Sequence, residues 1–331
     1  MKTYLITGGA GFMGANLTRK ILQQNPSATI HIIEPKNTNL WRLADIQNNI
    51  TLHHLSLIDF KDIQALVTTI KPTTIFHLAS YGGMPSQQKQ IPTFDVNLYG
   101  TINLLNACKK VGFDCFINTG SSSEYGKKDS PMKESDILEP NSDYGIAKAA
   151  ATHYCVKEAM LHNLPIYTIR PFSVYGDYEA STRLIPTVAL SFLANKQLNL
   201  SNPNNVRDFV YIDDIINAYI ILAEKKPSEP YVFNIGSGKQ SSIQDVINAL
   251  QQITQKTVPT HWQSIEPRPW EPTQWQANIE QARNVLGWAP LHTLEQGLQK
   301  TLQWFEHNQN LYLAKETKNE CLPSSTTANF S

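Results

Sequence analysis

The segment 118–148 carries side chains whose types and spacing suit proton transfer. Tyr144 and Lys148 lie four residues apart in an Ala-rich stretch that Ser142 is placed to cap, so a helix would present both side chains on one face. Tyrosine has a reference pKa of about 10, and a neighbouring ammonium group favours its ionised form. Tyr144 is therefore a candidate general base supported by Lys148.

A run of hydroxyl side chains ending in a carboxylate precedes this helix, and it reads Ser121-Ser122-Ser123-Glu124 before Tyr125-Gly126. A serine in this run could steady the oxygen whose proton Tyr144 removes. A positioned glutamate could remove a carbon-bound proton beside a carbonyl group. A glutamate next to a Tyr-Gly turn could equally be a solvated cap or an anchor for the backbone.

Glycines at positions 8, 11 and 14 follow the apolar run 2–7 and precede the helical stretch 15–22. Such a turn lets the backbone approach a pyrophosphate, and the helix that follows offers its free amides to the phosphates. A second strand, 28–33, ends in Glu34, where this type of site holds the adenosine ribose hydroxyls. The pattern predicts a dinucleotide-binding unit.

The charge of Glu34 disfavours a phosphate on that ribose, so we expect NAD to be the cofactor. Lys36 and Arg42 follow in the next loop, and either could pair with a ribose phosphate. NADP therefore stays open.

With these residues the chain resembles the extended short-chain dehydrogenase/reductase family, the NAD-dependent nucleotide-sugar epimerases and dehydratases, from Met1 to about Trp304. The likeness runs through ordered segments along the whole of that length: Thr7–Gly14, Phe76–Ser80, Asp95–Thr101, the serine run, Tyr144–Lys148, Arg170–Gly176, Arg207–Asp214, Asn234–Gly238 and Leu286–Pro290.

The resemblance implies three sets of site residues. Catalysis would rest on Ser122, Glu124, Tyr144 and Lys148. NAD would be bound by Gly8, Gly11, Phe12, Met13, Gly14, Glu34, Leu78, Ala79 and Lys148. The nucleotide sugar would be bound by Tyr81, Asn97, Ser123, Arg207 and Arg268.

The serine run departs from the family pattern, which usually has one more residue before the Tyr-Gly pair. Counting back from Gly126 selects Ser121 as the catalytic serine, whereas aligning Glu124 with the dehydratase glutamate selects Ser122. Ser122 is our prediction, and Ser121 remains the alternative. Asn97 could instead orient the loop at the site, and His77 is better explained as a structural histidine.

The resemblance implies chemistry through a 4-keto sugar. We expect 4,6-dehydration, with Tyr144 as base and Glu124 as the base at C5. A 4-epimerase and a 4-keto-sugar reductase are the enzyme alternatives. A non-catalytic protein that senses the cofactor or acts as a scaffold is the alternative of another class, although such a protein has no need of the Tyr144 and Lys148 pair.

The alternation of strand-like and helical stretches predicts an α/β fold with a doubly wound parallel sheet (Rossmann). The resemblance adds a smaller, discontinuous α/β substrate lobe. The expected domains are a nucleotide-binding domain over 1–172 plus 207–235 and a nucleotide-sugar lobe over 173–206 plus 236–305. The polar tail 306–331 is expected to lack fixed structure.

Composition limits the partners. The 331 residues have a formal net charge of zero and a pI near 7.1, so no nucleic-acid surface is indicated. No apolar run reaches the length of roughly 20 residues that spans a bilayer, and we expect a cytoplasmic protein. Four cysteines without close paired spacing predict neither a metal site nor disulfides.

The family likeness also suggests a homodimer that pairs the helices carrying Asn97 and Tyr144. The apolar residues that would allow this pairing are Leu98, Ile102, Leu105, Ala150 and Tyr154.

Overall fold

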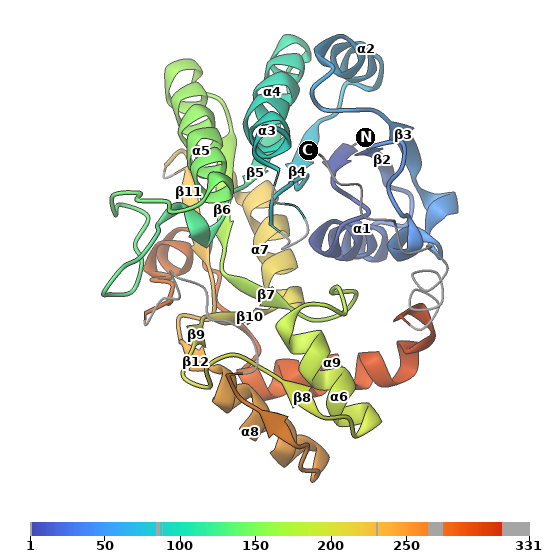
Figure 1. The fold of residues 1–331 in the computed structure, drawn as a ribbon. Helices are drawn as coiled ribbons and strands as arrows, with labels where there is room; N and C mark the ends of the chain where they lie inside the picture. The colour runs from blue at the N-terminus through green and yellow to red at the C-terminus, as the bar shows by residue number, and fades with distance from the viewer. Residues whose placement is uncertain (1, 84–86, 88, 230, 264–273, 313–331) are drawn as a thin grey trace, which may run out of the picture.

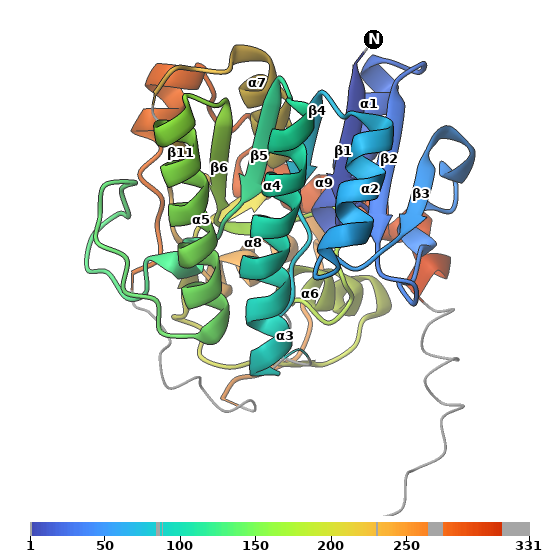
Figure 2. The same ribbon diagram turned by 90° about the horizontal axis from the view of Figure 1, so that it is seen from above.

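A seven-stranded parallel sheet forms the centre of the larger lobe (Figures 1 and 2). The computed structural model describes residues 2–83, 87, 89–229, 231–263 and 274–312. The strands of the sheet are β1 (Thr3–Thr7), β2 (Thr29–Glu34), β3 (Thr51–His54), β4 (Thr74–His77), β5 (Cys115–Thr119), β6 (Ile166–Pro171) and β11 (Val232–Ile235).

The strand order is β11-β6-β5-β4-β1-β2-β3, and every neighbouring pair is parallel. The order reverses between β1 and β4, so the carboxyl ends of those two strands mark the topological switch point of the sheet. In open α/β sheets this switch point is where ligands bind. The predicted doubly wound fold is confirmed.

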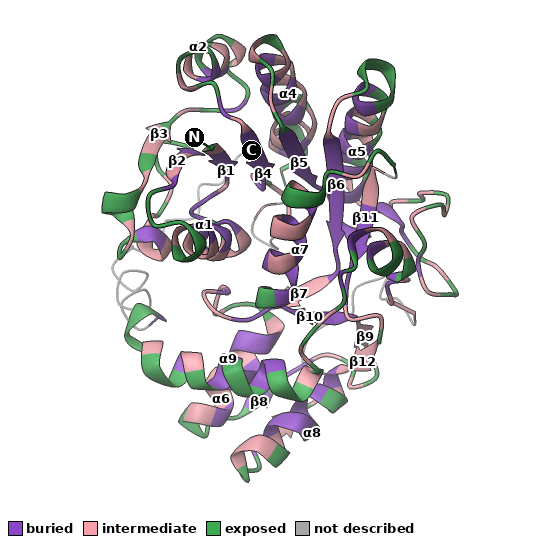
Figure 3. Cartoon of the chain, turned by 180° about the vertical axis from the view of Figure 1, so that it is seen from behind, coloured by how far each residue is buried: buried purple, intermediate pink, exposed green. Residues whose placement is uncertain are grey.

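Helices cover both faces of the sheet, as Figure 2 shows from above. One face carries α1 (Phe12–Gln24) and α7 (Ile212–Lys225). The other carries α2 (Phe60–Ile70), α4 (Gly100–Val111) and α5 (Asp143–His162), with α3 (Gln90–Phe94) and the π-helical turn Asp95–Tyr99 leading into α4. Because helices cover both faces, every residue of β4, β5 and β6 is buried (Figure 3).

The smaller lobe lies beyond the carboxyl ends of the strands (Figure 1). Its helices are α6 (Leu184–Ala194), α8 (Ile243–Thr254) and α9 (Leu294–Asn308). Its strands form three short pairs: β7 (Ser173–Tyr175) with β10 (Phe209–Tyr211), β8 (Leu198–Asn199) with β13 (Thr260–His261), and β9 (Val206–Arg207) with β12 (Ser241–Ser242).

These pairings move one expected domain boundary. Residues 207–211 were assigned to the nucleotide-binding domain, but β9 and β10 pair with strands of the smaller lobe. The chain returns to the larger lobe only at Ile212, where α7 begins.

Within the described residues, no helix has the length and apolar character that a membrane span requires.

The start of the polar tail also differs from expectation. Helix α9 continues to Asn308, and Tyr312 is buried. The Tyr312 ring lies 5.5 Å from that of Trp41, and its hydroxyl donates to the Glu179 carbonyl at 2.8 Å. Residues 313–331 lie outside the described part of the chain.

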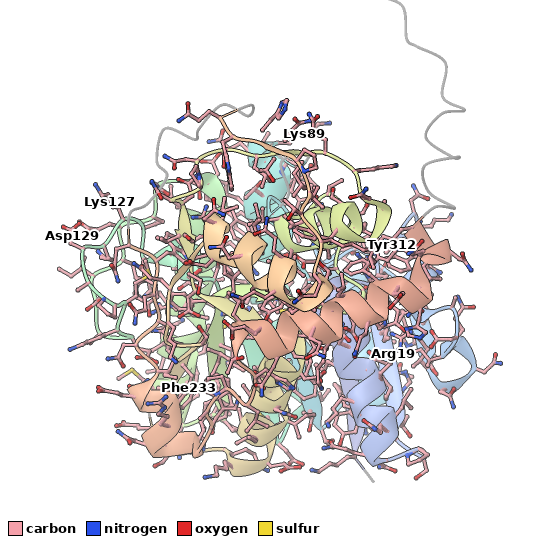
Figure 4. All side chains as sticks on the ribbon, turned by 90° about the horizontal axis from the view of Figure 1, so that it is seen from below. Arg19, Lys89, Lys127, Asp129, Phe233 and Tyr312 are labelled. Atoms are coloured by element: carbon pink, nitrogen blue, oxygen red, sulfur yellow. The ribbon has the colours of Figure 1, made fainter. Side chains whose placement is uncertain are left out.

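Tyr312 belongs to an aromatic cluster that joins the two lobes, which we call the C-terminal clasp: Trp41, Tyr178, Trp304 and Tyr312. Figure 4 shows Tyr312 where the last helix reaches α1, the helix that carries Arg19. The Arg19 guanidinium stacks 4.1 Å from the centre of the Tyr178 ring. Tyr178 also packs against Trp304, so it links the end of α9 to α1.

The clasp should contribute strongly to stability. We expect Tyr312→Ala to destabilise the protein by about 3 kcal/mol or more, because it empties a buried aromatic site. Tyr312→Phe should cost only about 1 kcal/mol, the value of one hydrogen bond. Thermal unfolding of both variants measures this, with the exposed neighbour Leu311→Ala as control. Equal midpoints for Tyr312→Ala and Leu311→Ala would contradict the role given to the clasp.

Candidate active site

Helix α5 holds Tyr144 and Lys148 across the carboxyl end of β5. Its N-terminus is capped by Ser142, whose hydroxyl accepts from the Gly145 amide at 3.1 Å. The Lys148 ammonium is buried, donates to the Thr119 carbonyl at 2.8 Å and lies 5.9 Å from the centre of the Tyr144 ring. Burial lowers the pKa of Lys148 to about 8, while the charge of Glu124 opposes the shift.

Burial raises the pKa of the Tyr144 phenol above its ordinary value. The groups that lower it are the Ser121 side chain and the Arg183 guanidinium, while the charge of Glu124 raises it further. Tyr144 therefore carries its proton in the ligand-free protein. The role of Lys148 in favouring the phenolate stays a prediction.

Ser121 is the serine whose side chain lowers the pKa of Tyr144. It caps a single 3-10 turn, Ser122–Glu124, and its hydroxyl accepts from the Ser123 amide at 3.1 Å. The side chain that acts on the Tyr144 pKa is that of Ser121 and not that of Ser122. The geometry thus favours the alternative that counting back from Gly126 had selected.

Glu124 faces the interior of the protein. Its Oε1 accepts from the Ser121 amide at 2.8 Å and from the Thr152 hydroxyl at 3.0 Å. Its Oε2 accepts from Arg170 Nε at 2.7 Å, and the side chain is fully buried. Both oxygens are engaged, so this arrangement does not favour the predicted role of Glu124 as the base at C5 and fits the alternative of a backbone anchor.

Arg170 continues this buried network toward β11. Its Nη1 donates to the Tyr125 hydroxyl at 2.8 Å, and that hydroxyl donates to the Asn234 side chain at 2.8 Å. Sequence reasoning did not give Arg170 a role. The available signal was its position in a largely apolar strand, 166–171, where a buried arginine requires a carboxylate partner.

The glycine turn has the shape of a phosphate cradle. A Cβ atom on Gly14 would lie 2.2 Å from the Gly8 carbonyl oxygen. Gly8 itself has φ of +68°, and a Cβ there would lie 2.7 Å from the Ala79 amide. Helix α1 begins at Phe12 after Gly11, which supplies no side-chain cap, so the amides of the first turn face the position of an anion. These residues fit a dinucleotide.

Glu34 is oriented by this turn. Its Oε1 accepts from the Ala10 amide at 2.6 Å, and the side chain is buried at the end of β2. Burial raises its pKa, against the hydrogen bonds from Ala10 and Thr38. Arg42, the residue that kept NADP open, donates from Nε to the Tyr178 carbonyl at 2.7 Å and stacks on Trp41, and Lys36 is exposed.

The remaining predicted residues divide between support and substrate binding. Asn97 is buried and donates to the carbonyl groups of Tyr81 and Thr93 at 2.6 and 2.8 Å, while its oxygen accepts from the Tyr81 amide. It therefore orients the loop after β4. His77 bonds the Thr7 and Thr101 hydroxyls through its two ring nitrogens, and burial lowers its pKa to about 3.

Arg207 lies in the smaller lobe, with its guanidinium 6.0 Å from the centre of the Trp275 ring. The neighbouring Asp208 carboxylate accepts from three amides and one hydroxyl, supplied by Ser237, Gly238 and Ala277. It thereby fixes the loop after β11. Arg268 lies outside the described residues.

Comparison with known proteins agrees with this geometry. Residues 4–236 match the profile of the NAD dependent epimerase/dehydratase family. The dTDP-glucose 4,6-dehydratase of Salmonella typhimurium is 26% identical over 336 residues, covering 92% of each chain. The UDP-glucuronate 4-epimerase of Thermodesulfobacterium geofontis is 26% identical over 318 residues, covering 93% of this chain and 97% of that protein.

Among solved structures, the UDP-glucuronic acid 4-epimerase from Bacillus cereus, determined with UDP-glucuronic acid and NAD, superposes with a TM-score of 0.82. It is 28% identical, and the match covers 93% of this chain and all of that one (100%). The chain belongs to the NAD dependent epimerase/dehydratase family. It is an NAD-dependent enzyme, and the predicted family and cofactor are confirmed.

Removing one member of the buried ion pair should destabilise the fold. We expect Glu124→Ala to cost about 3–5 kcal/mol, because it leaves the Arg170 guanidinium buried without its carboxylate. The double variant Glu124→Leu, Arg170→Met should recover part of this loss, since it removes both charges. Denaturant unfolding of the parent, Glu124→Leu, Arg170→Met and the double variant tests the pairing, and additive effects of the two single changes would contradict it.

Proposed function

We propose that this enzyme is a nucleotide-sugar 4-epimerase, which oxidises C4 of a nucleoside diphosphate sugar to a ketone and reduces it again from the other face. The proposal rests on where the hydroxyl and carboxylate side chains lie around α5. Tyr144, Ser121 and Lys148 lie together at the carboxyl end of β5. Glu124 is instead buried and hydrogen-bonded to Arg170 and Thr152.

The roles of the three residues follow from their surroundings. NAD supplies the acceptor for the hydride that leaves C4. Tyr144, once deprotonated, takes the proton of the C4 hydroxyl, and Ser121 holds the same oxygen with a hydrogen bond. Lys148, tied to the Thr119 carbonyl, places a positive charge beside them. When the hydride returns to the opposite face of the ketone, Tyr144 gives the proton back.

Dehydration is the second candidate, because a dTDP-glucose 4,6-dehydratase is among the relatives. That reaction needs a base for the C5 proton after C4 has been oxidised. Glu124 was our predicted base, but its two oxygens already accept three hydrogen bonds in the interior. The other side chains of the run 121–124 are hydroxyls. Epimerisation needs no such base, and the site therefore supports it better.

The substrate class is proposed from the solved relative that binds UDP-glucuronic acid. In the smaller lobe we assign Arg207 to the diphosphate, because an arginine guanidinium can donate two parallel hydrogen bonds to a phosphate group. Tyr81 and Ser123 are proposed to contact the sugar. Asn97 would act through Tyr81.

A homodimer stays a prediction, and part of its expected surface needs correction. Leu105 is fully buried in the protein's own core. Tyr99, Met160 and Leu161, in contrast, are exposed on the π-helical turn before α4 and on α5. These side chains extend the apolar surface of the two helices that we propose to pair.

The two serines are distinguished by substitution. Ser121→Ala should lower kcat by about 10²- to 10³-fold, the usual cost of removing a hydrogen bond to the reacting oxygen. Ser122→Ala is the matched control and should stay within about threefold of the parent protein. Tyr144→Phe should lose about 10²- to 10⁴-fold. A Ser122→Ala defect larger than that of Ser121→Ala would return the role to Ser122.

Product mass separates the candidate reactions. The protein is incubated with UDP-, GDP-, dTDP- and CDP-hexoses and NAD, and products are analysed by chromatography and mass spectrometry. We expect a product of unchanged mass and altered retention time. A product lighter by one water would establish dehydration, and conversion only of a 4-keto sugar with NADPH would establish a reductase. Activity that survives Tyr144→Phe undiminished would contradict the mechanism.

A further inference from the structure

The loop 176–183, between β7 and α6, runs from the glycine turn to the catalytic tyrosine. At one end the Asn16 side chain donates to the Asp177 carbonyl at 3.0 Å, which attaches the loop to α1. At the other end the Arg183 guanidinium donates to the Gly83 carbonyl at 2.8 Å. A Cβ atom on Gly83 would lie 3.9 Å from the Tyr144 hydroxyl. The loop therefore contacts both α1, which follows the glycine turn, and the segment beside Tyr144.

Its backbone is held in an unfavourable conformation. Tyr178 has φ of +67°, in the left-handed region that a bulky residue rarely adopts. Its carbonyl accepts from Arg42 Nε, and its ring packs 4.7 Å from that of Trp304. Such strain persists only where the surroundings enforce it, and it is concentrated at functional sites.

The residue that this conformation directs inward is Glu179. Its side chain is more than nine-tenths buried, with 7% of its surface exposed. Its Oε2 atom has no hydrogen-bond partner among the described residues, although nearly all buried polar atoms have one. The mechanism proposed above makes no use of this carboxyl group.

The charged and titratable groups around Glu179 come from both lobes. The group is desolvated, and burial raises its pKa to about 8 against the opposing charges of Arg183 and Arg42 and a hydrogen bond from the Gly176 amide. The other groups that interact with it are phenols, those of Tyr175 on β7 and Tyr312 beyond α9. At neutral pH the carboxyl group therefore carries a proton and can donate a hydrogen bond.

We infer that Glu179 is a diphosphate-binding residue, whose buried Oε2 atom forms a hydrogen bond with a phosphate oxygen of the bound ligand. The charges of Arg183 and Arg42 act on the Glu179 carboxyl group and favour an anion beside it, and an arriving anion strengthens the hold of the carboxyl group on its proton. The diphosphate could be that of NAD or that of the nucleotide sugar, and only the second source rests on the proposed function.

The test is the pH dependence of ligand affinity in Glu179→Gln, which keeps a donor at this position but cannot ionise. NAD is titrated into the protein, and UDP-glucose into NAD-saturated protein, by calorimetry between pH 6.5 and 9. The two proteins should bind alike at pH 6.5. Between pH 6.5 and 9 the ratio of wild-type to variant Kd should rise about tenfold for the ligand that Glu179 contacts. Lys148 titrates in the same range, but it affects both proteins and cancels in this ratio.

Asp177→Asn is the matched control from the same loop. Burial raises the pKa of Asp177 to about 6, and its carboxylate already accepts from Tyr211, so its Kd ratio should stay constant above pH 8. Glu179→Ala, which removes the donor, should weaken binding of the same ligand about tenfold or more at pH 6.5.

A rise in the ratio for NAD alone assigns Glu179 to the cofactor, and a rise for UDP-glucose alone assigns it to the substrate. Ratios that stay flat for both ligands overturn the inference, as does unchanged affinity in Glu179→Ala. If UDP-glucose does not bind while the NAD ratio rises, UDP-glucose is not a ligand of this protein and the role of Glu179 toward NAD stands.

Discussion

The ion pair between Glu124 and Arg170 is the interaction on which the site depends. A charge pair in a protein interior stabilises the fold only if its geometry and its remaining hydrogen bonds are complete. Here Thr152 and the Ser121 amide saturate one carboxylate oxygen, and Arg170 saturates the other. The pair therefore links the turn after β5, the strand β6 and the helix α5 in one place. The turn and α5 carry Ser121, Tyr144 and Lys148, the residues proposed to act on the sugar.

The Glu124 carboxylate of this pair also changes the pKa values of residues in the site. The carboxylate raises the pKa of both Tyr144 and Lys148. It thus keeps the lysine cationic against the cost of burial, while the phenol retains its proton until ligands arrive. Glu124, which the sequence suggested as the base at C5, can therefore influence proton transfer through its charge, without contact with the sugar.

The fold could be predicted because its signals are local. Gly8, Gly11 and Gly14 follow a strand and lead into a helix, and strand-like and helical stretches alternate along the part of the chain that forms the sheet. The direction of Glu124 could not be predicted, because its partner Arg170 is 46 residues away. The choice between Ser121 and Ser122 depends on one residue of register in a 3-10 turn, where adjacent side chains point in different directions.

The C-terminal clasp has a consequence for the order of folding. Tyr312 contacts Trp41 and Glu179, so this part of the core closes between segments that are far apart in the chain. Contacts of such large sequence separation form slowly, because the entropy of closing the chain must be lost before they contribute. We therefore expect the contacts that support Arg42 and the loop 176–183 to be among the last to form. If NAD binds the folded protein and not the unfolded chain, its binding would favour their completion by mass action.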